Sequence, residues 1–328
     1  MAARWTLTLA ASVVALCGFA LPATAQVKLD PDLPAYKKTI GVAGKITSVG
    51  SDSMNNLMQK WAEAFRGYYG GVRIDVQGQG SSTAMPALIA GAATFGPMSR
   101  DPKDSETKQF EDKFGYKPVL LPTSIDLLGV YVHRDNPLES LSMAQVDAIF
   151  SRTRKLGGGE PITNWGQLGL SGEYSGGRID LFGRNAASGT YGYFKEVALG
   201  NGDYLETVNE QAGSATVVQS VGENKFAIGY SGIGYKTAAV KAVSLSRDAE
   251  GKPVAPTPEN AYSGDYPLAR YLYLAVNYKP NTKMDPLRAE FIKFIFSREG
   301  QQIVVEDGYY PVTAQKANQV LKSLNLAK

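Results

Sequence analysis

Residues 184–190, Arg-Asn-Ala-Ala-Ser-Gly-Thr, join a predicted strand at 179–183 to a predicted helix at 191–199. The N-terminus of a helix presents unpaired backbone N–H groups and a partial positive charge. Arg184 adds a guanidinium, and Ser188 and Thr190 add hydroxyl groups that can donate hydrogen bonds. Together these groups predict a cradle for an oxyanion.

Two further turns rich in serine and glycine occur earlier in the chain, at 51–53 and 80–83. Each lies between a predicted strand and a predicted helix, which is where open α/β sheets bind their ligands. Taken singly, such turns are well explained as helix caps. Their combination with Arg184 favours a shared site, in which three turns surround one small tetrahedral anion.

The order of the predicted elements indicates an α/β fold with a mostly parallel sheet. A chain of 328 residues exceeds what one hydrophobic core usually serves, so we expect two lobes. Residues 247–266, which are rich in proline, glycine and acidic residues, are expected to form an exposed connection. The predicted strands are 45–49, 72–77, 93–98, 119–121, 127–133, 179–183, 226–230 and 271–277. The predicted helices are 53–65, 82–92, 142–150, 191–199, 217–221 and 287–296, the last followed by a further segment at 301–306.

The N-terminus has the pattern of a secretory signal peptide. Arg4 precedes an apolar run at 7–21, and Ala-Thr-Ala at 23–25 fits a cleavage site, so residues 1–25 are predicted to be removed. An uncleaved membrane anchor is the alternative, but the apolar run is short for a membrane span. The single cysteine, Cys17, leaves with this segment, so the mature chain has no thiol or disulfide. Residues 26–39 are expected to form an N-terminal arm.

Several classes of function lack support in the composition. The net charge is +3 and the basic residues are scattered, so no nucleic-acid partner is expected. With one histidine, His133, and no mature cysteine, we predict no catalytic triad and no metal site. The sequence contains no nucleotide-binding phosphate loop. We therefore expect a binding protein rather than an enzyme, with no catalytic residues and no cofactor.

The three turns carry a family resemblance. Residues 184–190 resemble the arginine and Ser-Gly-Thr motif of periplasmic phosphate-binding proteins that serve the phosphate-specific ABC importer. The turn at 78–82 is similar to the Gly-Ser-Ser motif of that family, and residues 46–61 are similar to its first strand, turn and helix. The resemblance extends over about residues 40–315. It implies the type II periplasmic binding protein fold, in which the ligand lies in a cleft between two lobes.

The resemblance also implies lobe boundaries and a set of site residues. Lobe I is expected at 40–122 and 268–328, and lobe II at 123–267. The turn before the first helix supplies three ligand-facing positions, and the Gly-Ser-Ser motif assigns its first serine to phosphate. The expected phosphate-binding residues are Asp52, Ser53, Met54, Ser81, Ser99, Arg100, Arg184, Ser188, Gly189 and Thr190.

One position departs from the family pattern. In the segment that matches residues 95–101, the best-studied branch of the family has an aspartate, which accepts a proton from phosphate and repels sulfate. This chain has Ser99 or Arg100 at that position. We hypothesise that Asp52 takes over this role, with Asp101 as the second choice. Arg100 is the candidate for a second positive contact with the anion.

The expected function is a periplasmic, monomeric receptor that binds inorganic phosphate and docks on the membrane permease subunits of an ABC importer. Three alternatives remain open at this stage. The ligand could be another oxyanion, such as sulfate, molybdate or tungstate, or an organophosphate. The chain could be a secreted phosphatase that uses Ser53 or Ser188 without histidine or metal, or an extracellular adhesin or sensor that retains the fold.

Overall fold

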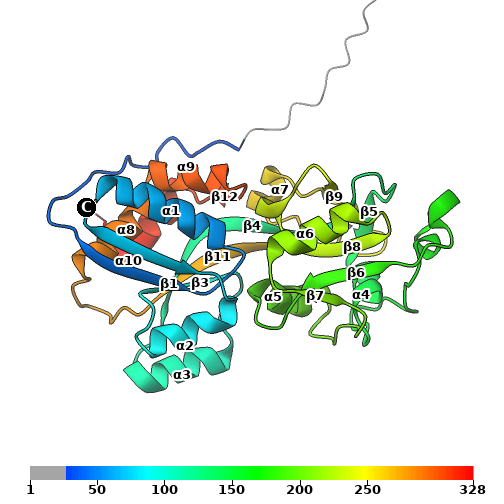
Figure 1. Ribbon diagram of the computed structural model, residues 1–328, viewed down its shortest axis with the longest axis horizontal. Coiled ribbons are helices and arrows are strands. Elements are labelled where there is room, and N and C mark those ends of the chain that lie inside the picture. The colour runs from blue at the N-terminus through cyan, green and yellow to red at the C-terminus, as the bar shows by residue number, and fades with distance from the viewer. Residues whose placement is uncertain (1–26, 328) are drawn as a thin grey trace, which may run out of the picture.

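The computed structural model describes residues 27–327 of the 328 (Figure 1). The predicted signal peptide and its cleavage site lie outside the described residues. Among the helices of residues 27–327, none is long and apolar enough to cross a membrane.

One path of hydrogen-bonded strands runs through the whole molecule in the order β2-β1-β3-β11-β4-β8-β6-β7. The pairs at its two ends are parallel, but β11 is antiparallel to β3 and β4, and β8 is antiparallel to β4. The sequence predicted a mostly parallel sheet, but this sheet mixes parallel and antiparallel pairs. Its strands are β1 (Gly44–Val49), β2 (Val72–Gln77), β3 (Phe95–Met98), β4 (Val119–His133), β6 (Asp180–Arg184), β7 (Asn209–Gln211), β8 (Ala227–Gly232) and β11 (Ala269–Val276). Short strands β5 (Ser140–Ser142) and β10 (Ser244–Ser246) pair with each other, while β9 (Val240–Ala242) and β12 (Tyr310–Pro311) pair with β4.

Strands β4 and β11 connect the two halves of the molecule (Figure 1). The sequence predicted two separate strands, 119–121 and 127–133, because Pro122 and Asp126 interrupt the apolar pattern, and the second was expected to cross between the lobes. The structure has one 15-residue strand instead. The pairing register shifts between Leu272 and Tyr273, and the hydroxyl of the extra residue, Thr123, donates to the Leu272 carbonyl at 3.1 Å. This bulge accommodates the proline without ending the strand.

Lobe I has a core formed by residues from both ends of the chain. The apolar face of α1 supplies Trp61, whose Nε1 donates to the Gly300 carbonyl at 2.8 Å, and Phe65, whose ring meets that of Phe291 edge-on at 5.1 Å. Two helices, α3 and α10, were not predicted; α3 buries only Phe110, so its sequence shows little apolar periodicity. The helices of this lobe are α1 (Asn55–Tyr68), α2 (Ala84–Ile89), α3 (Asp104–Phe114), α8 (Pro286–Ile295), α9 (Arg298–Glu306) and α10 (Ala314–Ser323), with the 3-10 turn η1 (Ser81–Thr83).

Lobe II has a separate core formed by the middle of the chain. The rings of Phe194 and Tyr230 stack at 3.9 Å, so α5 is fixed against β8. Residues 247–266, which we expected to be an exposed connection, include helix α7 and the buried Tyr266. The helices here are α4 (Met143–Phe150), α5 (Gly189–Ala198), α6 (Ser214–Glu223) and α7 (Pro258–Ser263), with the 3-10 turns η2 (Trp165–Leu168), η3 (Gly172–Tyr174) and η4 (Ile233–Tyr235).

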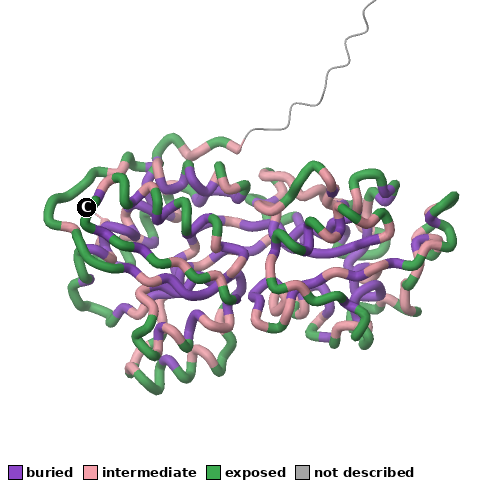
Figure 2. Tube along the Cα trace, in the orientation of Figure 1, coloured by how far each residue is buried: buried purple, intermediate pink, exposed green. Residues whose placement is uncertain are grey.

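The N-terminal arm lies against lobe I and has no regular secondary structure in its described part. Leu33 is buried, the Pro34 carbonyl accepts the backbone N–H of Arg298 at 2.8 Å, and the Tyr36 N–H donates to Glu299 at 2.6 Å. Buried residues follow the central strands of both lobes and continue through their junction (Figure 2). The predicted α/β fold with two lobes is confirmed.

Candidate functional site

The three predicted turns meet where the two lobes touch. From lobe II, the first turn of α5 brings Thr190 against Ser53 of lobe I, with 2.8 Å between their hydroxyl oxygens. Ser99 follows β3 and lies 2.9 Å from the Ser51 hydroxyl and 3.3 Å from the Ser81 hydroxyl. All six members of this hydroxyl cluster are at most 3% exposed: Ser51, Ser53, Ser81, Ser99, Ser188 and Thr190.

Two glycines allow the lobes to approach this closely. A β-carbon at Gly189 would collide with the hydroxyls of Ser81 and Ser99. A β-carbon at Gly80, whose φ is +105°, would collide with the Ala187 carbonyl. That carbonyl instead accepts hydrogen bonds from the backbone N–H and hydroxyl of Ser82 at 3.2 and 3.0 Å. The contact between the lobes therefore depends on the absence of side chains at these positions.

The hydroxyl cluster is arranged to donate hydrogen bonds. The Ser188 oxygen accepts the N–H groups of Thr190 and Tyr191 at 3.1 and 3.4 Å, as the N-cap of α5. The Ser81 oxygen accepts the Ser99 N–H at 3.0 Å. A hydroxyl that already accepts a hydrogen bond keeps its single proton for an acceptor. Such an arrangement suits a ligand that is rich in acceptors, as oxyanions are.

Arg184, at the end of β6, lies beside this cluster with 1% of its side chain exposed. Its terminal nitrogens contact the Ser214 hydroxyl, the Ala212 carbonyl at 2.8 Å and the Asp52 carboxylate at 3.1 Å. Its Nε is buried and has no partner among the described residues. Burial lowers the pKa of the guanidinium, and the facing Asp52 opposes that shift. A buried donor without a partner is costly. Within residues 27–327 the Arg288 Nε also lacks a partner, so the Arg184 Nε points to a ligand acceptor only together with the adjacent hydroxyl cluster.

Asp52 belongs to lobe I but binds groups of lobe II. The oxygen that faces Arg184 also accepts the Ser214 N–H at the start of α6, at 2.9 Å. The Tyr235 hydroxyl donates to the Asp52 backbone carbonyl at 3.0 Å and holds the turn in place. Asp52 is thus the carboxylate that contacts the predicted cradle, whereas Asp101 is exposed.

The side chains of two further predicted residues, Arg100 and Met54, contact groups outside the hydroxyl cluster. Both terminal nitrogens of Arg100 bind the Glu106 carboxylate, at 2.8 and 2.7 Å, in the first turn of α3. Its role as a second positive contact with the anion stays a prediction, because these nitrogens are bound to Glu106. The Met54 side chain is fully buried in the lobe I core, so only its backbone can face a ligand.

The guanidinium that reaches the hydroxyl cluster belongs to Arg270 on β11. Arg270 was not among the predicted site residues. Its Nη2 donates to the Thr190 hydroxyl at 3.0 Å, and its Nη1 donates to the Ser99 carbonyl at 2.6 Å. Its Nε and Nη2 also bind the Asp126 carboxylate on β4, at 3.0 and 2.7 Å. Burial raises the pKa of Asp126, and Arg270 opposes the shift. The one available signal was a charged residue in each of two apolar strands, since a buried charge needs a partner.

The two candidate nucleophiles, Ser53 and Ser188, are hydrogen-bonded to neighbouring groups. Within the described part of the chain, the Ser53 hydroxyl contacts the Thr190 hydroxyl, and the Ser188 hydroxyl contacts backbone N–H groups. His133 lies at the end of β4 and faces Asp135 at 3.7 Å. Residues 27–327 contain no cluster of side chains that could hold a metal ion.

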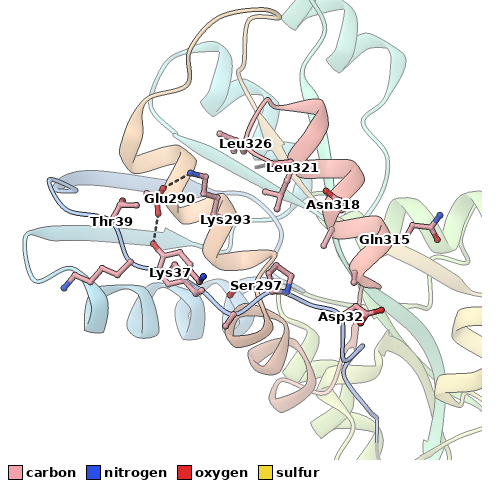
Figure 3. Close-up of a pocket in the computed structure, with 17 residues that line it drawn as sticks. Asp32, Lys37, Thr39, Glu290, Lys293, Ser297, Gln315, Asn318, Leu321 and Leu326 are labelled. Atoms are coloured by element: carbon pink, nitrogen blue, oxygen red, sulfur yellow. Dashed lines mark hydrogen bonds and ion pairs between the residues drawn. The ribbon is translucent and has the colours of Figure 1, made fainter.

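A cavity of about 770 Å³ lies elsewhere, between the N-terminal arm, α8 and α10 (Figure 3). We call it the arm groove. Leu321 and Leu326 line one side, while Lys293 is bound to Glu290 at 2.9 Å. The Tyr36 hydroxyl donates to the same glutamate at 3.0 Å. None of the predicted site residues lines the arm groove, so its volume does not identify it as the anion site.

Comparisons with known proteins agree with the site's chemistry. The sequence pattern of the PBP superfamily domain matches residues 37–299. The chain is 52% identical over 304 residues to the phosphate-binding protein PstS of Pseudomonas aeruginosa, covering 93% of this chain and 94% of that protein. It is 30% identical to the phosphate-binding protein PstS of Staphylococcus haemolyticus, covering 83% and 82% of the two chains.

Solved structures that resemble this chain also include phosphate-transport proteins. The chain is similar, with a TM-score of 0.68 and 27% identity, to a putative phosphate ABC transporter substrate-binding protein with bound phosphate from Clostridium perfringens. That match covers 82% of this chain and 100% of the other. An ABC-type phosphate transport receptor from Vibrio cholerae matches with a TM-score of 0.62 and 25% identity, over 81% and 100% of the two chains.

Proposed function

We propose that this chain, which belongs to the PstS family of phosphate-binding proteins within the PBP superfamily, captures inorganic phosphate between its lobes and delivers it to an ABC importer. The observation that carries the proposal is the buried set of directed hydroxyl donors beside Arg184, whose Nε lacks a partner in the described chain. Several charge-assisted hydrogen bonds of about 1.5–3 kcal/mol each would support micromolar or tighter binding without a strongly positive protein.

The ligand contacts follow from the same donors. In this proposal the guanidinium of Arg184 and the hydroxyls of Ser53, Ser81, Ser188 and Thr190 bind the phosphate oxygens. The backbone N–H groups at the start of α1 and α5, including those of Met54 and Gly189, complete the cradle. Ser99 supports the Ser81 hydroxyl, to which its own N–H donates at 3.0 Å. Arg100 takes part only if its guanidinium leaves Glu106.

Selectivity against sulfate would come from a carboxylate. Phosphate near neutral pH retains a proton that it can donate, whereas sulfate has none and is repelled by a charged carboxylate. We propose Asp52 as the acceptor because it contacts Arg184, with Asp101 as the alternative. Asp52→Asn removes the charge and keeps the shape, so it should allow sulfate to compete with phosphate. An Asp52→Asn protein that still rejects sulfate would transfer the role to Asp101, to be tested by Asp101→Asn.

The biological setting is part of the proposal. Residues 1–25 direct export to the periplasm, and the mature chain acts as a monomer that docks on the permease subunits. Lobe I comprises 40–122 and 268–328, and lobe II comprises 123–267. The two separate hydrophobic cores support this division, and the names of the relatives support the transport role.

Calorimetric titration tests the function directly. The protein spanning residues 26–328, freed of ligand by partial unfolding, is titrated with phosphate, sulfate, molybdate and tungstate. Tight binding of phosphate alone is expected, with a loss of about 10- to 150-fold in Arg184→Lys, because a hydrogen bond to a charged group contributes about 1.5–3 kcal/mol. Arg288→Lys is the matched control: Arg288 lies on α8 and donates to the Asn277 carbonyl.

The other outcomes are equally informative. Tight binding of molybdate, tungstate or sulfate without phosphate would replace the proposed ligand. Equal losses in Arg184→Lys and Arg288→Lys would show that the cradle is not at Arg184. Hydrolysis of a chromogenic phosphate ester by the purified protein would contradict a pure binding function.

A further inference from the structure

We infer that Arg270, anchored by Asp126, is a positioning residue that fixes the Thr190 hydroxyl as a hydrogen-bond donor. It also ties the two lobes together in the closed arrangement, in which they touch at the hydroxyl cluster. The inference deepens the proposed function and rests on it. Arg270 lies 80 positions from Thr190 in the sequence, and the two residues belong to different lobes in the proposed division.

One guanidinium connects three parts of the molecule. It binds Asp126 on β4 through Nε and Nη2, the Ser99 carbonyl after β3 through Nη1, and the Thr190 hydroxyl of α5 through Nη2. Its side chain is 3% exposed, and that of Asp126 is 0% exposed. A planar guanidinium with a fixed fork can hold several acceptors in one geometry.

The direction of the Thr190 hydroxyl follows from the chemistry of its neighbour. A guanidinium has no acceptor, so the Thr190 oxygen must accept the bond from Arg270. The single proton of the hydroxyl is then left for the Ser53 oxygen, 2.8 Å away, or for a bound oxyanion. Arg270 therefore preorganises a donor and lowers the cost of orienting it when the ligand binds.

The anchor lies on the strands that connect the lobes. Asp126 and Arg270 are directly paired across β4 and β11, so their contact is set by the sheet itself. The Ser99 carbonyl belongs to lobe I, whereas Thr190 belongs to lobe II. Opening of the lobes would separate one of these two acceptors from the guanidinium, so the full set of contacts belongs to the closed arrangement.

Charge alone does not explain this residue. Asp126 already compensates the charge of Arg270, as Asp52 does for Arg184 and Glu106 for Arg100. The contribution of Arg270 is therefore mainly geometric. Lysine at this position would keep the charge but could not serve Asp126, Ser99 and Thr190 at the same distances. This separates a positioning role from simple electrostatic attraction.

A double-mutant cycle tests the inference. Phosphate affinity is measured by calorimetry for the wild type, Arg270→Lys, Thr190→Val and the double variant, with Arg288→Lys as the control. Arg270→Lys should weaken binding about 10- to 100-fold in the wild-type background but less than about threefold in the Thr190→Val background, because contacting residues couple. An equal loss in both backgrounds would overturn the positioning role.

One further measurement and one replacement variant keep the outcome clear. Small-angle X-ray scattering without phosphate should give a larger radius of gyration for Arg270→Lys than for the wild type or Arg288→Lys. An unchanged radius would contradict the tie between the lobes, even if the wild type binds no phosphate and the proposed function fails. If Arg270→Lys does not fold, Asp126→Leu with Arg270→Met removes both charges and replaces it in the cycle, since buried ion pairs tolerate paired apolar replacement.

Discussion

The hydroxyl cluster between the lobes and the arm groove differ in what their polar groups have left to bind. In the arm groove, Lys293 and the Tyr36 hydroxyl are both bound to Glu290. At the cluster, the hydroxyls accept bonds from backbone and guanidinium groups, and the Arg184 Nε has no partner in the described chain. The groove has a cavity of about 770 Å³, but within the described chain a buried donor without a partner lies beside the cluster and none lies in the groove lining. Hydrogen-bonding capacity therefore identifies the anion site better than volume does.

Among the variants that test this contrast between the two regions, Gly189→Ala is expected to change phosphate affinity the most. In Gly189→Ala the added methyl group collides with the hydroxyls of Ser81 and Ser99, so the lobes cannot reach their present contact. Overpacking of a tight contact costs about 1–3 kcal/mol, and phosphate affinity should fall by up to about 100-fold. Calorimetry measures this change. Gly67→Ala is the control because nothing lies within 4 Å of the added atom, and a loss of the same size there would contradict the collision argument.

A smaller effect is expected at Ser188, which caps α5 and lies in the cluster. Ser188→Ala removes the acceptor for the N–H groups of Thr190 and Tyr191. Loss of an N-cap costs about 1 kcal/mol, so urea denaturation should show that decrease and phosphate affinity should fall about tenfold. In the control, Ser297→Ala, the N-cap of α9 is lost instead, so stability should fall while affinity stays unchanged. Normal phosphate affinity in Ser188→Ala would remove this hydroxyl from the proposed cradle.

The smallest effect is expected in the arm groove. Lys293→Met removes the ion pair between the partly exposed Lys293 and the buried Glu290, which keeps the hydrogen bond from the Tyr36 hydroxyl, so the cost is about 1 kcal/mol. Phosphate affinity should change less than about twofold in calorimetry, and the midpoint of urea denaturation should shift only slightly. A loss of affinity as large as that in Ser188→Ala would show that the arm groove is coupled to anion binding, and the contrast between the two regions would fail.

Local patterns explain which parts of the fold were predictable. Helix α1 was expected because Leu57, Trp61 and Phe65 repeat at helical spacing and all become buried. Helix α3 was missed because Phe110 is its only buried residue. Strand β4 was wrongly predicted as two strands because a proline such as Pro122 is typical of a strand end. Only the pairing with β11 shows the β-bulge that accommodates the proline within one strand.

The same distinction applies to the candidate site. Arg184, Ser188 and Thr190 lie within seven residues, so a strand end and a helix start suffice to place them together. The relation between Arg270 and Asp126 spans 144 residues, and neither lies in a recognisable motif. Their meeting requires the antiparallel pairing of β4 with β11, which is a tertiary feature.

The sequence by itself determined the α/β class, the two lobes, the three serine and glycine turns and the family. These depend on periodicity, capping and short motifs, which act over a few residues. Only the tertiary structure decided that Arg100 binds Glu106, that Arg270 reaches Thr190 and that Asp52 crosses to Arg184. The physical reason is that a charged side chain buried between two lobes must find its partner across the fold, and the local sequence does not specify which partner comes within reach.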